Sequence, residues 1–478
     1  MAESLKNKTV KGTIWSTLER FSVQGIQFVV MIIMARLLTP EDYGLVGMLA
    51  IFIAVAQSFV DSGFSSALIR KQDRSEVDNS TVFYFNIGVG IFFYLLIYIA
   101  APWIAEFYKQ PILIPLTRVI GLSVILNSLV VVQRALLTIK IDFKTQATAS
   151  FIGSIIAGAL GIWMAYNGFG VWAIVYQQLT NLAIITLLLW YLSHWKPIWA
   201  YSWSSFHELF SFGSKLLVSG LLDTIYRNMY LLVIGKVFKA SDLGYYTRAH
   251  QFTDFASSNI TGIFQRVTFP VLCTIQDDDV RLADVYRRLL KISSFIIFPL
   301  MMGLAAMAKP MILSFLTEKW LFSAIIIQIL CFSQMWYPVH AINLNLLQVK
   351  GRSDLFLRLE IIKKINGVVM LCITLPLGLI PMCCGMIVTS IIALVINTHY
   401  TGKLIKLGFL SQMKDLLPTL VLSIFVGAIV YFTIASISLN SWLALGVGVI
   451  EGILLYVGLA KLFRFSEFSE LLTIIRRK

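Results

Sequence analysis

The feature that most constrains this chain is a succession of long apolar stretches, separated by short polar segments that carry most of the charge. A helix needs about 20 mostly apolar residues to cross the hydrocarbon core of a bilayer. The sequence therefore predicts an all-α integral membrane protein with about fourteen transmembrane helices. Strands are not expected, because the stretches are too long and lack an alternation of period two. The predicted spans are 13–36, 43–68, 80–105, 112–135, 146–166, 170–192, 209–236, 243–270, 289–315, 322–347, 357–379, 381–402, 415–437 and 441–461.

The composition excludes an ordinary soluble domain. Only 13% of the 478 residues are charged, about half of the roughly 25% that is usual in soluble proteins. The net charge of +14 would suggest nucleic acid as a partner in a soluble protein. Here the basic residues lie between the apolar stretches, which is typical of cytoplasmic loops. No nucleic-acid partner is expected.

The distribution of Lys and Arg predicts the orientation. With the N-terminus inside, 28 of the 39 basic residues fall on the inward side, 6 on the outward side and 5 within spans. Cytoplasmic loops carry this excess in multi-pass proteins. The first apolar stretch carries Glu19, Arg20 and two glutamines and ends without a small-residue cleavage site, so a retained helix is expected. We predict a protein of the bacterial inner (cytoplasmic) membrane with both termini in the cytoplasm.

The chain repeats itself. Residues 35–44 (ARLLTPEDYG) return as residues 235–244 (GKVFKASDLG), with matching basic, apolar, Asp and Gly positions. Two further matches share an offset of 210: residues 136–140 with 346–350, and Gly168 with Gly378. Chance similarity of short helix-end motifs is the alternative, but three matches in register argue against it. Because the offsets preserve helix direction, the first and second six spans form parallel repeats.

The repeat predicts the domain organisation. Residues 1–200 should form an N-terminal six-helix bundle and residues 201–408 a second one. Residues 409–478 hold the appended helices 13 and 14 and a cytoplasmic tail. Duplicated transporters commonly bind their substrate between the repeats, so a central cavity is expected.

Ionisable residues are concentrated in the first two spans of each repeat. An ionisable side chain in mid-membrane costs at least about 2.5–3.5 kcal/mol, so these residues must face water or one another. Depths estimated at about 1.5 Å per residue allow Arg20 to pair with Asp61, and Arg227 with Asp254. The eight residues are Glu19, Arg20, Asp61, Lys215, Asp223, Arg227, Arg248 and Asp254.

Two polar stripes suggest the wall of a hydrated cavity. Thr13, Thr17, Arg20, Gln24 and Gln27 follow one face of span 1, and Lys215, Ser219, Asp223 and Arg227 follow one face of span 7. The hypothesis assigns substrate contacts to Arg20, Gln24, Gln27, Lys215, Arg227 and Arg248. It assigns ion coupling or structural pairing to Glu19, Asp61, Asp223 and Asp254. The alternative is that the charges are only structural ion pairs that lock the two halves together.

No catalytic or metal-binding constellation is present in the sequence. There is no phosphate-binding loop and no nucleotide fingerprint, and the five cysteines do not pair in metal-ligand spacing. The five histidines do not cluster and are predicted to lie at the membrane interface. We therefore expect no enzyme activity, metal or cofactor. Transport energy would come from an ion gradient, the membrane potential or the substrate gradient.

Three segments carry a resemblance to a known family: ARLLTPEDYG at 35–44, DSGFSSALIR at 61–70 and GFGVWA at 168–173. With them, the chain resembles the Wzx-type polysaccharide flippases of the multidrug/oligosaccharidyl-lipid/polysaccharide exporter superfamily, and in particular its colanic-acid exporter-like branch. The resemblance implies a MATE-like fold with two bundles and a central cavity. It also implies movement of a polyprenyl-pyrophosphate-linked oligosaccharide from the cytoplasmic to the periplasmic leaflet, for O-antigen, capsule or exopolysaccharide synthesis.

The resemblance further implies alternating access coupled to H⁺ or Na⁺. Membrane lipids, a polysaccharide polymerase and chain-length machinery are the implied partners. A monomer is expected, because one chain already contains both repeats.

Two other classes of function are weighed against the flippase. A multidrug or metabolite cation antiporter of the same fold should have a cavity dominated by acids, whereas four acids here meet four bases. A polysaccharide polymerase or glycosyltransferase usually needs a sizeable loop or soluble domain, and the longest polar stretch is only the loop around residues 276–284.

Overall fold

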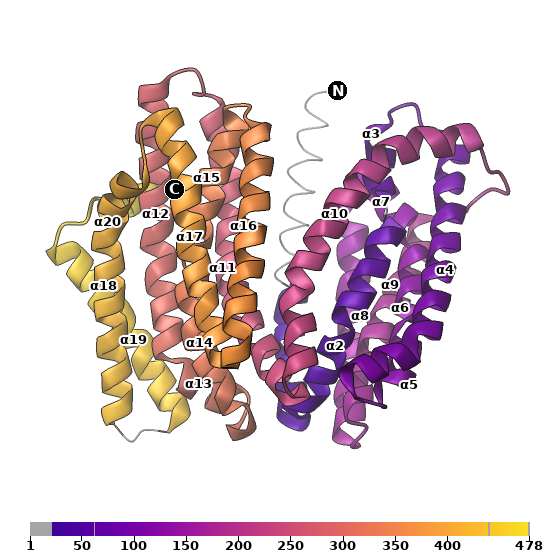
Figure 1. The fold of residues 1–478 in the computed structure, drawn as a ribbon, viewed down its shortest axis with the longest axis horizontal. Helices are drawn as coiled ribbons and strands as arrows, with labels where there is room; N and C mark the ends of the chain where they lie inside the picture. Colours follow the sequence, from indigo (N-terminus) through magenta and orange to yellow (C-terminus); the bar gives the residue numbers. More distant parts are fainter. Residues whose placement is uncertain (1–21, 62, 438–439, 477–478) are drawn as a thin grey trace. The chain divides into compact units, whose positions relative to one another are not determined.

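A computed structural model describes residues 22–61, 63–437 and 440–476 (Figure 1). Within these ranges the chain consists mainly of helices joined by short connections and forms no β-strand, which confirms the predicted all-α class. Eleven of the described helices are long and apolar enough to cross a membrane. The chain divides into two compact units, residues 1–244 and 245–478, and each is described by itself.

The described part of unit 1 begins with the helix Ser22–Leu37. The following helices are α2 (Pro40–Asp61), α3 (Phe64–Arg70), α4 (Glu76–Tyr108), α5 (Leu113–Ile120), α6 (Leu122–Ser128), α7 (Val131–Ile139), α8 (Phe143–Tyr166), α9 (Val171–Ser193) and α10 (Trp203–Val237). The first residues of α11 (Ala240–Cys273) complete the unit.

Unit 2 contains the rest of α11 and the C-terminal helices. These are α12 (Asp279–Ala306), α13 (Ala308–Phe315), η1 (Glu318–Trp320), α14 (Leu321–Gln334), α15 (Tyr337–Val349), α16 (Ser353–Thr374), η2 (Leu375–Leu377), α17 (Leu379–Ile405), α18 (Phe409–Ser436), α19 (Ser441–Leu462) and α20 (Ser466–Arg476).

Four predicted spans are interrupted helices. The predicted span 43–68 is divided between α2 and α3, and 289–315 is divided between α12 and α13. The predicted span 112–135 consists of α5, α6 and the start of α7. The predicted span 322–347 breaks between α14 and α15. There Pro338 has no N–H for the carbonyl of Gln334, four residues earlier. That carbonyl instead accepts a hydrogen bond from the Ser257 hydroxyl at 2.9 Å.

Three predicted spans are missing from the eleven apolar helices. The described part of the first, Ser22–Leu37, is shorter than a full span. The other two, predicted at 243–270 and 357–379, correspond to α11 and α16. Both have enough residues to cross a bilayer but are too polar to be recognised by composition. Their polar residues are part of the candidate site.

Small residues allow α8 to pack closely in unit 1. Ala149, Gly153, Ala157, Gly161 and Ala165 recur every four residues, and all five are buried. A Cβ atom at Gly153 would lie 2.9 Å from the Ile185 side chain on α9. Close packing of this kind replaces the hydrophobic effect as the force that joins helices within a bilayer.

The starts of α2 and α11 are in reciprocal backbone contact. A Cβ atom on Gly44 would lie 1.7 Å from the carbonyl oxygen of Ala240. A Cβ atom on Gly244 would lie 1.8 Å from the carbonyl oxygen of Pro40. No side chain fits at either distance, so both positions require glycine.

The same two helix starts are capped alike. The Asp42 carboxylate accepts a hydrogen bond from the Thr39 N–H at 2.9 Å. The Asp242 carboxylate accepts one from the Lys239 N–H at 3.2 Å. The first sequence match of the repeat, at an offset of 200, is therefore also a match of structure.

Helix α10 packs on α2, α3 and α4, within unit 1. The hydroxyls of Ser58 on α2 and Thr224 on α10 are 3.0 Å apart. A Cβ atom on Gly63, before α3, would lie 2.7 Å from the carbonyl oxygen of Gly213 on α10. The domain boundary predicted between residues 200 and 201 follows the sequence repeat and stays a prediction.

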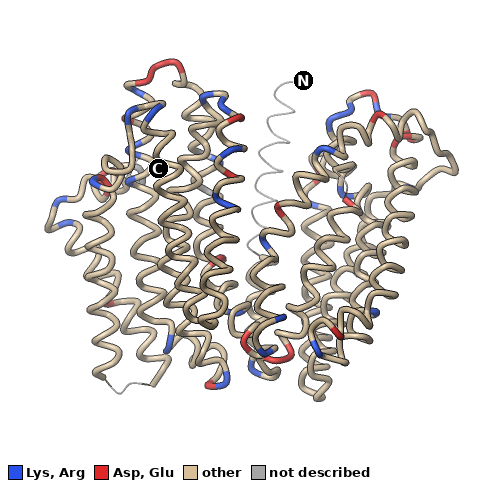
Figure 2. Tube along the Cα trace, viewed as in Figure 1, with Lys and Arg blue, Asp and Glu red and all other residues tan. Residues whose placement is uncertain are grey.

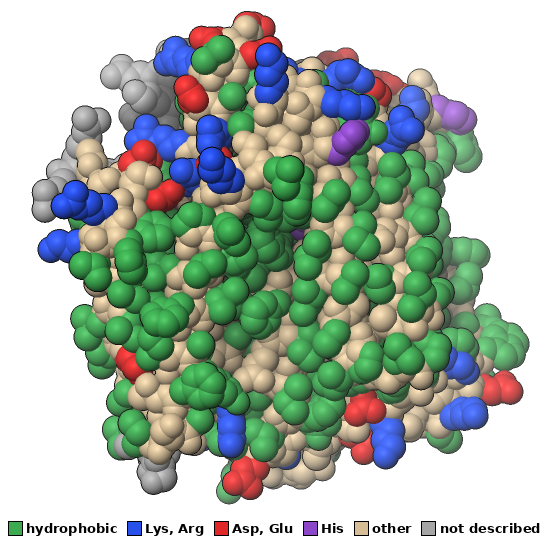
Figure 3. All heavy atoms as spheres, turned by 60° about the vertical axis from the view of Figure 1, so that its left-hand side comes forward, with side chains coloured by type: hydrophobic (Ala, Val, Ile, Leu, Met, Phe, Trp, Pro, Cys, Tyr) green, Lys and Arg blue, Asp and Glu red, His purple; other side chains and the backbone are tan. Residues whose placement is uncertain are grey.

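Charged residues gather near the helix ends, and α10 also carries them midway along its length (Figure 2). The face of unit 2 in Figure 3 has a broad band of hydrophobic side chains between charged groups at either end. Exposed apolar residues of α18 and α19, such as Val421, Phe432 and Leu454, contribute to the apolar surface of this unit. Such a band is expected of a surface in contact with lipid.

Candidate functional site

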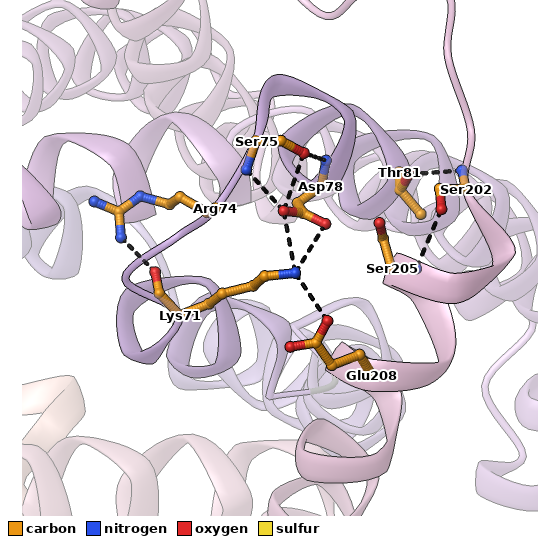
Figure 4. A network of polar contacts seen from close by, with 8 residues as sticks. All are labelled: Lys71, Arg74, Ser75, Asp78, Thr81, Ser202, Ser205 and Glu208. Atoms are coloured by element: carbon orange, nitrogen blue, oxygen red, sulfur yellow. Dashed lines mark hydrogen bonds and ion pairs between the residues drawn. The ribbon is translucent and has the colours of Figure 1, made fainter.

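The N-terminal part of α10 is fixed by Lys71, which lies between α3 and α4 (Figure 4). Its ammonium group donates a hydrogen bond of 2.8 Å to Glu208 on α10 and one of 3.3 Å to Asp78 on α4. The hydrogen bond to Glu208 is the main cause that raises the pKa of Lys71 above its ordinary value. Lys71 therefore stays charged and holds α10 against the start of α4.

The segment before α10 is hydrogen-bonded to the same end of α4. Asp78 and Ser75 form a capping box at the start of α4. The Thr81 hydroxyl accepts a hydrogen bond from the Ser202 N–H at 3.1 Å (Figure 4). The Ser80 hydroxyl accepts one from the Ile198 N–H at 3.0 Å. These contacts set the direction in which α10 leaves this end of the unit.

The predicted stripe on α10 lies on an uncovered face of the helix. Lys215 and Ser219 are exposed. Arg227 Nε is 2.7 Å from Asp223 Oδ2, and the two side chains are 71% and 46% exposed. The arginine is thus held by a carboxylate one turn away while most of its surface stays available. The pairing of Arg227 with Asp254 stays a prediction, since the two belong to different units.

Asp61 lies beside the same helix. It ends α2, is exposed, and accepts a hydrogen bond from the Ser65 hydroxyl at 2.9 Å. The contact of Gly63 with Gly213 brings this turn next to the part of α10 that precedes Lys215. The structure thus places an acid at the start of the stripe.

The stripe predicted on span 1 is only partly described. Gln24 is half-buried and Gln27 is exposed on the helix Ser22–Leu37. Glu19 and Arg20 lie outside the described residues. The pairing of Arg20 with Asp61 therefore stays a prediction.

Arg248 and Asp254 have different surroundings on α11. Arg248 is only 6% exposed, donates a hydrogen bond of 2.6 Å to Gln251, and has its guanidinium 6.0 Å from the ring centroid of Trp320. Asp254 is half-buried and within electrostatic reach of His250. Arg248 therefore packs within unit 2, in contrast to the exposed Arg227.

A charged pair on α16 was missed by the sequence analysis. The Lys363 ammonium contacts the Glu360 carboxylate one turn away, and the lysine side chain is 16% exposed. Lys363 is the eleventh residue of α16, about 15 Å along the helix from its start. The sequence analysis placed Lys363 in the predicted span 357–379 but counted it with the inward helix ends and loops, because it lies close to the start of that span.

His340 is also misplaced by the sequence analysis. It lies within α15, nine residues before the helix ends at Val349. Its Nδ1 accepts a hydrogen bond from the Asn397 amide, and its Nε2 is 3.1 Å from the Ser390 hydroxyl. The partners fit a neutral imidazole with its proton on Nε2. His340 therefore belongs to a network inside the bundle and is not an interfacial residue.

A second polar network lies beside it. Asn343 donates a hydrogen bond of 3.1 Å to Gln412 and accepts one of 2.7 Å from Thr401. Gln412 also contacts the Tyr286 hydroxyl at 3.5 Å. These buried groups join α12, α15, α17 and α18. Asn and Gln within apolar stretches were the available sequence signal, but the analysis considered uncharged polar residues only where they shared a helix face with charged ones.

No group of three or more His, Cys, Asp or Glu that could hold a metal ion occurs in the described part of the chain. What the geometry offers is a spanning helix, α10, with exposed cationic groups, and a second unit that holds two polar networks in a mainly apolar interior. Exposed cations on a spanning helix suit the recognition of an anionic group.

A family model described as "Polysaccharide biosynthesis protein" matches residues 33–325, more than half of the chain. The chain belongs to this polysaccharide biosynthesis protein family. The membership confirms the resemblance drawn from residues 35–44, 61–70 and 168–173.

Relatives of this polysaccharide biosynthesis protein support the same family. It is 25% identical to the teichuronic acid biosynthesis protein TuaB of Bacillus subtilis, over 74% of this chain and 73% of TuaB. It is 25% identical to the lipopolysaccharide biosynthesis protein WzxC of Escherichia coli, over 75% of this chain and 74% of WzxC. It is 24% identical to the succinoglycan biosynthesis transport protein ExoT of Rhizobium meliloti, over 70% and 68%.

Solved structures share the fold of this family member. The lipid II flippase MurJ, in an inward closed conformation, matches with a TM-score of 0.77 at 16% identity, over 94% of this chain and 98% of MurJ. An inward-facing multidrug resistance MATE family transporter of the MOP superfamily matches with a TM-score of 0.63 at 16% identity, over 80% and 95%. The predicted MATE-like fold is thereby confirmed.

Proposed function

We propose that this protein is a flippase for polyprenyl-pyrophosphate-linked oligosaccharides. It would move repeat units from the cytoplasmic to the periplasmic leaflet for the synthesis of a surface polysaccharide. Family membership and the names of TuaB, WzxC and ExoT support this class of substrate. The fold, shared with a lipid II flippase, is compatible with a lipid-linked saccharide.

The observation that carries the proposal is the exposed polar stripe of α10. Lys215 and Arg227 present cationic groups from a spanning helix, and Asp223 holds Arg227 in position. A guanidinium binds pyrophosphate oxygens through paired, charge-assisted hydrogen bonds. Gln24 and Gln27 would bind sugar hydroxyls, and Arg20 would add a further cation.

Alternating access coupled to H⁺ or Na⁺ belongs to the same proposal. The acids Asp61, Asp223 and Asp254 remain its candidates for ion coupling, together with Glu19. We add Glu360 on α16, because its partner Lys363 is one of the few ionisable groups well inside unit 2. Arg248, which is buried, would position α11 rather than contact the substrate.

The setting in the cell completes the proposal. The bias of 28 inward against 6 outward basic residues supports an inner-membrane protein with both termini in the cytoplasm. A polymerase and chain-length machinery would receive the flipped product. We expect a monomer without a catalytic step, metal or cofactor.

The alternative is a multidrug or metabolite cation antiporter, since MATE transporters share the fold. The α10 stripe argues against it, because its two bases outnumber its one acid. A cationic substrate would meet net repulsion along this helix.

The test is reconstitution in liposomes that contain a fluorescent polyprenyl-pyrophosphate oligosaccharide. We expect protein-dependent movement between leaflets that is lost in Arg227→Gln and in Arg20→Ala. Lys406→Gln, an exposed lysine after α17, is the control and should keep the wild-type rate. Wild-type rates in both arginine variants, or ion-driven uptake of a soluble cation in place of lipid movement, would contradict the proposal.

A further inference from the structure

A pocket of about 750 Å³ opens in unit 2 beside α18. It is lined by Lys291 of α12, by the first half of α18, by Phe463 and Phe465 between α19 and α20, and by the start of α20. Its volume lies in the range of roughly 300–1,000 Å³ that is usual for small-molecule sites. The apolar part of its lining includes Leu417, Val421, Leu422, Phe425, Phe463 and Phe465.

One end of the pocket is charged, and its acids already have partners. Arg287 donates two hydrogen bonds, of 2.8 and 2.6 Å, to the Asp415 carboxylate. The Lys291 ammonium lies 3.8 Å from Asp415 and 3.7 Å from Glu467. Arg287 and Lys291 therefore balance the negative charge of the two carboxylates.

Lys414 is the remaining cation of the pocket lining. It is exposed, and no carboxylate among the described residues forms an ion pair with it. The charged lining consists of Lys291 and Lys414 with Asp415 and Glu467. Both carboxylates are already paired with Lys291, and Asp415 also with Arg287 from outside the lining, so Lys414 is the cation that remains for a ligand. This end of the pocket therefore favours an anion.

The apolar part of the pocket lies along the membrane-spanning part of α18. Lys414 and Phe425 are eleven residues apart, or about 16 Å along the helix. Leu417, Val421 and Phe425 are exposed on this side. A soluble anion would leave the apolar part of the pocket empty. A phospholipid would fill it with an acyl chain and place its phosphate at Lys414.

We infer that this pocket binds an anionic phospholipid of the leaflet at the basic end of unit 2. The phosphate contacts Lys414, and one acyl chain lies along α18 between Leu417 and Phe425. Lys461 and Arg464, both exposed near Phe463, add to the attraction for an anionic headgroup. The residues of this site belong to unit 2, whereas the α10 stripe belongs to unit 1.

The experiment measures lipid association in the absence of transport substrate. The full chain is placed in phosphatidylcholine vesicles with trace spin-labelled phosphatidylglycerol or spin-labelled phosphatidylcholine, and the motionally restricted fraction of each is compared. We expect the wild type to prefer phosphatidylglycerol. Lys414→Gln should reduce that preference about fivefold, and Lys140→Gln, an exposed lysine of unit 1, should leave it unchanged.

A second variant tests the apolar part of the pocket. Val421→Trp fills this part of the pocket from an exposed position and should reduce restriction of both labelled lipids. Equal restriction of the two lipids by the wild type, or an unaltered preference in Lys414→Gln, overturns the inference. Displacement of the labelled lipid by polyprenyl phosphate but not by unlabelled phosphatidylglycerol would also overturn it, because the pocket would then hold the substrate's tail. No outcome depends on flipping, so the inference and the proposed function fail separately.

Discussion

Helices α8 and α16 hold equivalent places in the repeat, at an offset of 210, but have opposite chemistry. Gly153 on α8 corresponds to Lys363 on α16. The glycine lets α8 approach α9, with Asn181 and Ile185 near 3 Å from the position of a Cβ atom. The lysine instead pairs with Glu360 inside unit 2.

The starts of α2 and α11 show the opposite behaviour. They also correspond through the repeat, yet both keep the capping aspartate and the contact glycine. The difference teaches that the two repeats retained the residues that fix backbone geometry. Positions that set only the spacing between neighbouring helices were free to acquire charge in the second repeat.

The largest effect is expected where the repeats are alike. Gly44→Ala or Gly244→Ala places a Cβ atom less than 2 Å from a backbone carbonyl oxygen. We expect each to lower the free energy of unfolding by more than about 3 kcal/mol, measured by thermal unfolding in detergent. Gly220→Ala on α10, where a Cβ atom meets nothing within 4 Å, is the control. Wild-type melting of both contact variants would show that the helix starts are not in close contact.

The next largest loss of stability is expected when Gly153 is replaced by the residue at the corresponding position of the second repeat, a lysine. Gly153→Lys introduces both a clash with α9 and a charge in the bilayer, while Gly88→Lys, in open space on α4, introduces only the charge. We expect Gly153→Lys to be less stable than Gly88→Lys by about 2 kcal/mol. Equal melting temperatures would mean that α8 has room for a larger residue and that the contrast with α16 is only one of charge.

The charge on α16 should matter more for transport than for folding. Lys363→Gln leaves Glu360 without its ion pair, at a stability cost of about 1 kcal/mol. We expect the flipping rate in liposomes to fall at least about tenfold. The double variant Glu360→Gln/Lys363→Gln should recover the stability but not the rate. Full transport by the double variant would assign the pair a structural role only.

The smallest effects are expected at two lysines that play similar parts in the two units. Lys71 bonds to Glu208 and Asp78, and Lys350 bonds to Asp279 and to the Gln276 carbonyl. Lys71→Met and Lys350→Met should each cost about 1 kcal/mol of unfolding free energy. The raised pKa of Lys71 makes its contribution complete below the ordinary lysine pKa and lost as pH rises through the folded value. A wild-type loss of stability at high pH should therefore be smaller in Lys71→Met.

Much of the fold could be predicted because the bilayer makes apolar length a direct signal. The spans near 80–105 and 146–166 correspond to α4 and α8 with small shifts at their ends. Pro338 was a sequence signal for the interruption between α14 and α15, but Pro102 and Pro299 lie inside continuous helices, so proline alone did not locate the break. The Ser257 hydroxyl, which reaches the freed carbonyl from a helix distant in sequence, could not be predicted.

The candidate site was predictable only where its residues are charged and lie on one face. The spacing of Lys215, Asp223 and Arg227 indicated the exposed face of α10. The same reasoning could not show that Arg248 is buried, since its cover comes from Trp320, 72 residues later in the chain. Lys363 and His340 were missed because their depth depends on where α15 and α16 begin and end.

The packing of α10 on α2 has a consequence for biosynthesis. When only the first 200 residues have been synthesised and inserted, every helix of the first sequence repeat is present. Helix α2 then still lacks its contact with α10, which begins at Trp203. Ser58 then has no Thr224, and the turn at Gly63 has no Gly213. The nascent chain must keep this face protected until residue 237 has entered the bilayer. A gene cut at the repeat boundary would accordingly express a fragment prone to degradation, whereas a cut after residue 244 would release a unit with this face covered.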